Sequence, residues 1–365
     1  MNNSIIADIR ENLTNIYETT LKVAMDIGKS DTKVACGETE IRSAFKFPTV
    51  IDAPNVFTMY GASDLFSTSL ITDKGDKDKE IPRSYFVGTT GCKIHTTTDN
   101  AKDGRGGTKE NNHDKEIAIL CGSLGICMAM EAHGVHTAYI KAAMGMPIIE
   151  FSKYQNIKDG LTKYFGNILP IGREVVCSYN GEEYRFTITE GRMFPETLSA
   201  YLYGQSFNNE TRRLILVDIG GNNIQYVLST DTGISDDETL TFTDKHGVNE
   251  FLDNLLTAEE GVDALNKKAV SKAMLQEWLT DPTQNPLTGD KRKRFDDCYK
   301  KAAKEYLETN IFDVLKRKYA DYREYNYKII YTGGGAMLFK NILGEGRLLP
   351  DGEFANVKGF YSLIH

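Results

Sequence analysis

Two short segments of this chain carry nearly the same chemistry in nearly the same order. Residues 22–28 read KVAMDIG, and residues 214–221 read LILVDIGG. Each is an apolar, β-branched run, typical of a buried strand, that ends at an aspartate followed by a glycine turn. Asp26 and Asp218 are therefore expected at the ends of two equivalent strands. Two carboxylates that face one gap are suited to hold a hydrated Mg²⁺ ion, because Mg²⁺ prefers oxygen ligands and keeps several of its waters.

The turn after the first strand has the composition of a phosphate site. Residues 26–33 read DIGKSDTK. Glycine lets the backbone approach a ligand closely, and successive N–H groups of such a turn form a concave anion site. Lys33, on the returning strand, would add a cation near the β- or γ-phosphate. A plain hairpin with a polar turn is the alternative. The residues expected to bind phosphate here are Gly28, Lys29, Ser30, Asp31 and Lys33.

Two further glycine-rich turns extend the pattern. Residues 218–225 read DIGGNNIQ, and the phosphate-binding residues expected there are Gly220, Gly221, Asn222 and Asn223. Residues 332–336 read TGGGA and follow a predicted strand over residues 328–331. Three consecutive glycines cost conformational entropy, which is reasonable where a base and its sugar must lie against the backbone. Gly333, Gly334, Gly335 and Ala336 are the residues expected to contact a nucleoside.

One glutamate is a candidate for the chemical step. Glu196 follows Pro195, where the sequence predicts the start of a helix over residues 196–203. An acid in the first helical turn is favoured by the helix dipole, which explains this residue without any function. The functional interpretation is a carboxylate that orients or deprotonates the water attacking a γ-phosphate.

Composition limits the class of protein. A length of 365 residues favours two domains, and 41% hydrophobic with 26% charged residues is typical of a soluble globular protein. A net charge of −8 argues against a surface devoted to nucleic acid. Six scattered cysteines fit a reducing cytosol, and neither a secretory signal nor a membrane-spanning run is expected.

The elements that must position these residues repeat as well. Apolar residues at helical spacing predict a helix over residues 3–18, ahead of the first strand. The order β-β-β-α-β-α is then expected in both halves. The expected parts are an extension over residues 1–20, a first domain over 21–207 with an inserted lobe at about 48–110, a second domain over 208–345, and a C-terminal segment over 346–365 that packs back on the body.

Other elements follow from local patterns. The sequence predicts helices over residues 113–133, 153–164, 248–256, 264–279, 293–318 and 336–343, and further strands over 32–36, 40–47, 137–146, 174–179, 182–188, 224–229 and 240–243. Asn180-Gly181 predicts a hairpin turn. The basic run at 291–294 is expected in a solvated loop, and the single tryptophan, Trp278, in a core.

Taken together, the three turns, the FPET segment at 194–197 and the GMP turn at 145–147 resemble the actin and sugar-kinase superfamily. Within it the chain is similar to the ParM/StbA type of bacterial actin, the plasmid-segregation ATPases. The resemblance spans residues 22–340. It implies an actin-like, ribonuclease H-like duplicated α/β fold with two domains around a nucleotide cleft, and it assigns the hydrolytic role to Glu196.

The resemblance also implies a ligand and partners. These are ATP, or GTP, with Mg²⁺; other copies of the chain in a filament; and a ParR-like DNA-binding adaptor, with no direct contact to nucleic acid or membrane and a cytoplasmic location. The second turn departs from the family, which usually has Thr where Asn222 and Asn223 stand and Asp where Gln225 stands. A small-molecule kinase of the same superfamily, for sugar or acetate, and a non-catalytic nucleotide-binding scaffold stay open as alternatives.

Overall fold

The computed structural model describes residues 19–28, 31–52, 65–74, 80–88, 102–103, 112–207, 213–230, 233–235, 237, 241–257, 270, 272–321, 327–344 and 347–365. The predicted helix over 3–18, together with Lys29 and Ser30 of the first turn, lies outside these residues. The chain divides into two units: the first comprises the residues up to Ser199 together with Asn356–His365, and the second is Ala200–Ala355. Each unit has its own hydrophobic core.

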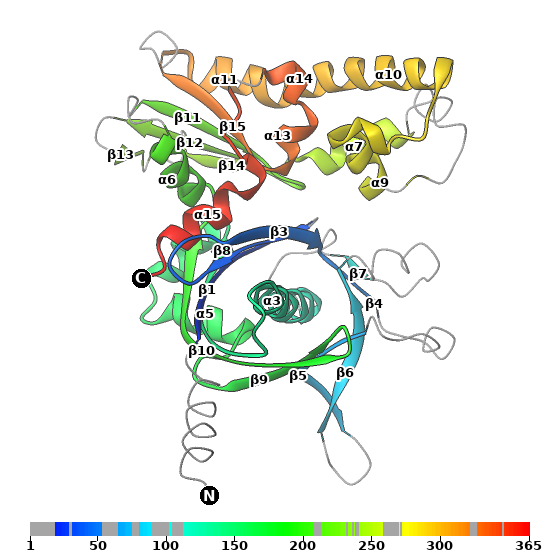
Figure 1. Cartoon of the computed structure of the whole chain (residues 1–365). Coiled ribbons are helices and arrows are strands. Elements are labelled where there is room, and N and C mark those ends of the chain that lie inside the picture. Colours follow the sequence, from blue (N-terminus) through cyan, green and yellow to red (C-terminus); the bar gives the residue numbers. More distant parts are fainter. Residues whose placement is uncertain are drawn as a thin grey trace, which may run out of the picture. The chain divides into compact units, whose positions relative to one another are not determined.

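In the first unit a curved sheet surrounds one long helix, α3 (Asn112–Ala132) (Figure 1). The helix is apolar around most of its circumference, as expected for a helix that is enclosed by other elements. The sheet order is β3-β2-β1-β8-β10-β9-β5-β6-β4-β7. The strands are β1 (Thr20–Ile27), β2 (Asp31–Gly37), β3 (Ser43–Pro48), β4 (Val50–Asp52), β5 (Phe66–Lys74), β6 (Glu80–Val87), β7 (Lys102–Asp103), β8 (Thr137–Met146), β9 (Glu174–Tyr179) and β10 (Glu182–Pro195).

The structure confirms the predicted hairpin of the first unit but not the helix predicted over residues 153–164. The hairpin between β9 and β10 is confirmed, and Asn180 and Gly181 both take positive φ values, 53° and 78°, as its tight turn requires. The single helix predicted over 153–164 is wrong. Two helices stand there, α4 (Ile148–Gln155) and α5 (Gly160–Ile168), because Asp159 takes the left-handed conformation at φ 58° and separates them.

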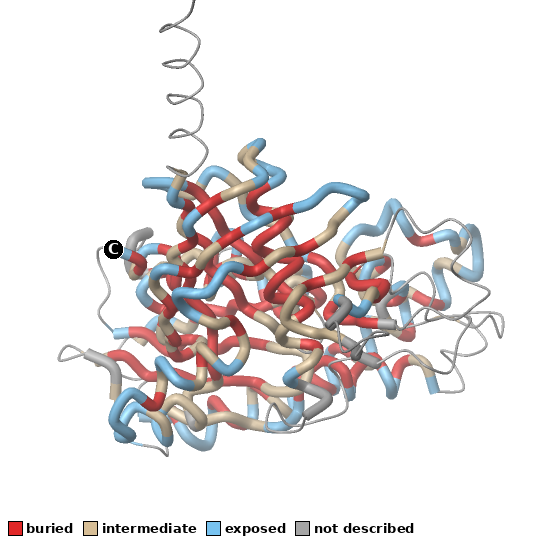
Figure 2. Tube along the Cα trace, turned by 90° about the horizontal axis from the view of Figure 1, so that it is seen from below, coloured by how far each residue is buried: buried red, intermediate tan, exposed pale blue. Residues whose placement is uncertain are grey.

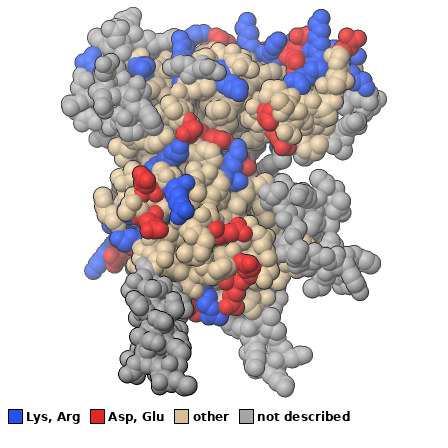
Figure 3. Space-filling view, viewed as in Figure 1, with Lys and Arg blue, Asp and Glu red and all other residues tan. Residues whose placement is uncertain are grey.

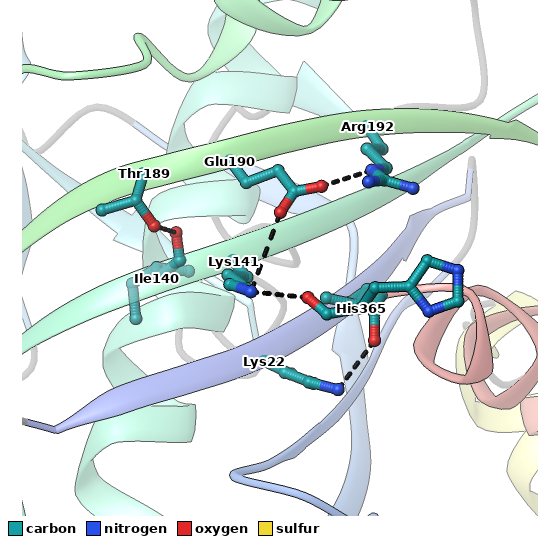
Figure 4. Close-up of polar contacts among 8 residues, drawn as sticks. Lys22, Ile140, Lys141, Thr189, Glu190, Arg192 and His365 are labelled. Atoms are coloured by element: carbon teal, nitrogen blue, oxygen red, sulfur yellow. Dashed lines mark hydrogen bonds and ion pairs between the residues drawn. The ribbon is translucent and has the colours of Figure 1, made fainter.

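The last residues of the chain lie against the central strands of this sheet. Lys22 of β1 donates to the carbonyl oxygen of Ile364 at 2.7 Å, and Lys141 of β8 donates to the main-chain oxygen of His365 at 2.6 Å. Glu190 of β10 lies 3.9 Å from the Lys141 ammonium (Figure 4). Helix α15 (Ala355–Ser362) leads into this segment, so the end of the chain is part of the first unit.

The second unit is built on a smaller sheet with the order β13-β12-β11-β15, and β14 also pairs with β12. Its strands are β11 (Leu214–Ile219), β12 (Ile224–Thr230), β13 (Gly233–Ile234), β14 (Phe242–Asp244) and β15 (Lys328–Thr332). Its helices are α6 (Leu198–Phe207), α7 (Val248–Thr257), α9 (Lys272–Thr280), α10 (Gly289–Leu307), α11 (Asp313–Lys318), α13 (Gly334–Leu338) and α14 (Lys340–Leu343). Trp278 is 6% exposed in this core, as predicted.

The helical region between β14 and β15 differs in detail from the prediction. A π-helical turn, Glu308–Phe312, separates α10 from α11, so residues 293–318 are not one regular helix. The basic run at 291–294 lies inside α10 and not in a loop, and Arg292 pairs there with Asp296 at 3.0 Å. Lys291, Lys293 and Arg294 are exposed there and Arg292 is half-buried, so the surface of α10 carries these charges.

Burial follows the strands of both units, whose middle residues are mostly buried (Figure 2). Acidic and basic side chains are interspersed on the face drawn in Figure 3, including along α10. Within the part of the chain that the structure describes, no helix is both long and apolar enough to cross a membrane.

Candidate nucleotide site

In the first unit three parallel strands bring two candidate acids to one edge of the sheet. Strand β1 pairs in parallel with β8, and β8 pairs in parallel with β10, with Pro195 opposite Met146. Because the three strands run the same way, their carboxyl ends lie together. Asp26 is the penultimate residue of β1 and Glu196 follows β10, and the two strands are separated by two strand spacings, about 10 Å, across the sheet.

The first turn has a closed geometry that explains its glycine. The N–H of Gly28 donates to the carbonyl oxygen of Asp31 at 3.2 Å. A Cβ at Gly28 would lie 2.8 Å from that same oxygen, so a larger residue would push the turn open. Asp26 is 7% exposed and lies directly opposite Lys33 in the antiparallel ladder, so the acid and the cation share one face of the hairpin.

Beneath this turn lie polar residues that the sequence pattern did not single out. The hydroxyls of Thr32 and Thr49 are 2.9 Å apart, and both residues are fully buried. The Cys121 thiol of α3 also hydrogen bonds Thr32, and burial raises the pKa of this thiol to about 12. Cys121 therefore stays a neutral thiol. The alternation of residues along β2 points Thr32 inward, but its partners lie far away in sequence.

Glu196 lies in a turn and not in a helix. Its N–H donates to the carbonyl oxygen of Met146 at 2.8 Å, which continues the pairing of β10 with β8. Helix α6 begins only at Leu198, and Thr197 stands between them at φ 61°. The predicted helix start at Glu196 is therefore wrong, and the helix dipole does not explain this acid. Its side chain is half-buried.

The second unit repeats the first turn closely. The N–H of Gly220 donates to the carbonyl oxygen of Asn223 at 2.9 Å, and a Cβ at Gly220 would lie 2.9 Å from that oxygen. Asp218 is 6% exposed and lies directly opposite Gln225. The two hairpins thus agree in the acid, the glycine and the turn hydrogen bond. They differ at the position opposite the acid, where only the first carries a cation.

The triple glycine packs against the second turn. Strand β15 is parallel to β11, with Thr332 beside Asp218. Gly333 has φ 88°, and a Cβ there would lie 2.2 Å from the Asp218 carboxylate. A Cβ on Gly335 would lie 2.7 Å from the carbonyl oxygen of Ile219. Close packing therefore accounts for two of the three glycines, and Ala336 is only 1% exposed.

Residues at the start of α7 support the second turn, and the sequence patterns did not predict this contact. The N–H groups of Val248 and Asn249, at the start of α7, donate to the carbonyl oxygens of Gly220 and Gly221 at 3.0 and 2.7 Å. The Asn249 side-chain amide donates to the side-chain oxygen of Asn222 at 2.5 Å. A single glycine just before a predicted helix, Gly247, was the available signal.

Gly247 lies so close to the turn that no side chain fits. A Cβ there would lie 2.3 Å from the Asn222 carbonyl carbon and 2.4 Å from the Asn223 nitrogen. The turn of residues 220–223 is thus held by its own hydrogen bond and by its contacts with residues 247–249. We call residues 247–249 the α7 brace.

The comparisons place this geometry in a known fold. No family model and no curated protein sequence matches the chain. Its structure is similar to that of Bacillus thuringiensis ParM with ATP, with a TM-score of 0.66 and 14% identity over 95% of this chain and 98% of that one. It is also similar to the actin-like protein Alp7A, with a TM-score of 0.67 and 14% identity over 94% of this chain and 96% of that one.

An archaeal actin homolog, Ta0583, is a third similar structure, with a TM-score of 0.61 and 18% identity over 94% of this chain and 98% of that one. The chain therefore has the actin-like α/β fold, and the fold prediction is confirmed. Identities this low establish the fold alone.

Proposed function

We propose that this chain binds and hydrolyses ATP with Mg²⁺, and that it assembles into filaments which segregate plasmid DNA through a DNA-bound adaptor. The observation that carries the proposal is the matched pair of turns, one in each unit, on an actin-like fold. Similar structures include ParM with ATP, with AMPPNP and with ADP.

Each turn supplies what a phosphate chain needs. The backbone N–H groups of a glycine turn suit phosphate oxygens, and Lys33 adds one positive charge. In the second turn Asn222 and Asn223 replace the usual threonines, so side-chain amides would donate where hydroxyls do in relatives. The resulting contacts of the second turn are neutral, so positive charge in this proposal comes from the first turn, where Lys33 supplies it.

Asp26 and Asp218 fit a magnesium ion. Both carboxylates are nearly buried, and each lies at a strand end beside a glycine turn. Such acids suit Mg²⁺, which is commonly bound through one or two carboxylates, water and substrate phosphates. When bound, the ion would neutralise charge on the phosphate oxygens. No step of the proposed reaction is assigned to either aspartate as acid or base.

Glu196 is the residue proposed to act on water. It lies at the same sheet edge as Asp26, about two strand spacings away, which leaves room for a γ-phosphate and an attacking water. Its carboxylate would orient that water or accept its proton as the bond to phosphorus forms. The leaving group is ADP.

Filament assembly follows from how a nucleotide would act on such a fold. A triphosphate gripped by both units biases the angle between them, and hydrolysis removes the bias. A head-to-tail contact that does not close into a ring generates a helical filament. With a net charge of −8, the chain is better suited to reach DNA through a basic adaptor than by itself.

The test uses the full-length chain with ATP and MgCl₂. We expect a fluorescent ATP analogue to bind, phosphate to be released, and the protein to pellet on ultracentrifugation with AMPPNP. Asp218→Asn should weaken binding of the analogue at least about tenfold, since a charge-assisted contact contributes roughly 1.5–3 kcal/mol. Asp253→Asn is the matched control, because Asp253 is an exposed acid on α7 that pairs with Lys272.

Two results would count against the proposal. The first is a failure of the wild-type chain to bind ATP or GTP at millimolar concentration. The second is binding without any sedimentable polymer at any protein concentration, which would reject the filament and retain the nucleotide site. Faster turnover with a panel of sugars or with acetate than with water alone would favour a small-molecule kinase.

A further inference from the structure

Three residues of helix α15, which is labelled in Figure 1, contact the segment over residues 194–199 that contains Glu196. The Asn356 side-chain oxygen accepts the N–H of Thr197 at 2.8 Å. Gly359 lies so near Ser199 that a Cβ there would be 2.0 Å from the Ser199 carbonyl oxygen. The Phe360 ring stacks on Phe194 with centroids 6.2 Å apart. The end of the chain is therefore fitted to the turn that follows β10.

Thr197 is in a strained conformation at this contact. Its φ is 61°, in the left-handed region, and its side chain is fully buried. A β-branched residue rarely adopts this conformation, because its Cβ crowds the backbone. Such strain persists only where the surroundings hold it, and it is common beside functional sites. Here the hydrogen bond to Asn356 is a contact that holds it.

We propose that Asn356 is a positioning residue for Glu196. By accepting the Thr197 N–H, it keeps Thr197 left-handed, and this fixes the direction in which the preceding residue presents its carboxylate. The inference rests on the proposed function, because it assumes that Glu196 acts on water at this edge of the sheet.

The contacts of Glu196 explain why a change in the Thr197 backbone should move the Glu196 carboxylate. Glu196 is fixed on one side by its N–H bond to Met146 and on the other by Thr197. The Glu196 Cγ also lies close to Gly145, since a Cβ on that glycine would be 3.2 Å from it and 2.7 Å from the Phe360 ring. If Thr197 relaxes to a negative φ, the backbone between these fixed points must turn, and Glu196 turns with it.

A matched pair of substitutions isolates the hydrogen bond. Asn356→Leu keeps the size of the side chain and removes the acceptor, whereas Asn356→Asp keeps an acceptor. We expect Asn356→Leu to lower the kcat for ATP hydrolysis by about 10- to 100-fold, as for a misplaced catalytic group, with the dissociation constant of the ATP analogue changed less than about threefold. Asn356→Asp should recover most of the loss in kcat.

Hydrogen exchange gives a readout that does not depend on activity. In the wild type the Thr197 amide should be protected, and Asn356→Leu should release it while the protection of β8 and β10 stays unchanged. Loss of protection throughout the first unit would mean that Asn356 only supports folding, and would overturn the proposal. Protection that does not change at Thr197 would overturn it as well.

A double-mutant cycle separates positioning from stability. Glycine adopts left-handed φ without strain, so Thr197→Gly should make the turn less dependent on Asn356. We expect Asn356→Leu to lower kcat by less than about threefold in the Thr197→Gly background. Equal losses in both backgrounds would reject the proposed role. A wild-type chain that binds ATP without hydrolysing it would instead reject the role assigned to Glu196, and this inference with it.

Discussion

Two glutamates near the end of β10 form a matched pair for testing a single residue. Glu196 lies at the same sheet edge as Asp26, two strands away, whereas Glu190 lies within β10 and pairs with Arg192 and Lys141. We expect Glu196→Gln to lower ATP hydrolysis about 10²- to 10⁴-fold with nucleotide affinity retained, because a general base contributes to the chemical step and not to binding. Phosphate release and analogue binding, measured on the same preparation, check this.

Glu190→Gln is the control for that experiment. Its carboxylate is part of a partly exposed ion-pair group, for which losses of about 0–1 kcal/mol are usual. We expect hydrolysis at nearly the wild-type rate. If Glu196→Gln also hydrolyses ATP at the wild-type rate, Glu196 does not act on the water. That result would favour the alternative of a non-catalytic nucleotide-binding scaffold.

Residues whose positions are set by their own strand and turn were predictable from sequence. Asp26, Gly28, Asp218 and Gly220 fall where predicted, because an apolar run followed by glycine is a local pattern. Thr197 was not predictable, because one of the hydrogen bonds that hold its conformation comes from a residue 159 positions away.

At the scale of elements, the α7 brace makes a specific prediction about the second turn. We expect Gly247→Ala to disturb the turn, because the added Cβ would overlap the backbone at Asn222. Forced overpacking usually costs about 1–3 kcal/mol. The melting temperature should fall, and the affinity for the ATP analogue should fall further than the loss of folded protein accounts for.

Gly166→Ala, in α5, is the matched control for this substitution. A Cβ there meets nothing within 4 Å, and alanine is the better helix former. Its melting temperature should stay level or rise, with nucleotide affinity unchanged. If Gly247→Ala behaves like Gly166→Ala, the brace does not hold the phosphate turn.

Element boundaries show where local patterns stop being sufficient. The strand over residues 137–146 was predicted at its observed bounds, since β8 is a continuous run between a turn and Pro147. The helix predicted over 196–203 is present as α6, but its predicted start is wrong, because Pro195 lies opposite Met146 at the end of a strand. Pairing across a sheet is long-range, and the local sequence around a proline does not distinguish a strand end from a helix start. Residues 308–312 carry no glycine or proline that would mark the π-turn.

At the scale of the whole molecule, the two units repeat one arrangement with different cores. The first encloses α3 within a curved sheet, and the second packs aromatic residues such as Phe251, Tyr306 and Phe339 against each other. The sequence indicated the duplication through its two Asp-Ile-Gly turns. It could not indicate that the last residues, from Asn356, join the first unit, because that depends on contacts such as Lys22 with Ile364.

The fluorescence of the single tryptophan can test the proposal that both turns bind the same nucleotide. Trp278 lies in the core of the second unit, so its fluorescence reports unfolding there, whereas circular dichroism reports both units. If both turns hold the same nucleotide, ATP with Mg²⁺ should raise the melting temperature seen by both probes. At 100 times the dissociation constant the stabilisation is about 2.7 kcal/mol.

Lys33→Ala then decides whether the units share the ligand. Lys33 is in the first unit, so a ligand held by the second turn alone would protect Trp278 equally well in this variant. We expect instead that the ATP-dependent rise in the Trp278 melting temperature shrinks, because losing a phosphate contact in one unit lowers occupancy in both. Lys163→Ala, at an exposed position of α5, should leave the rise intact. A Trp278 response to ATP that is identical in Lys33→Ala and wild type would show that the two turns do not act on one nucleotide.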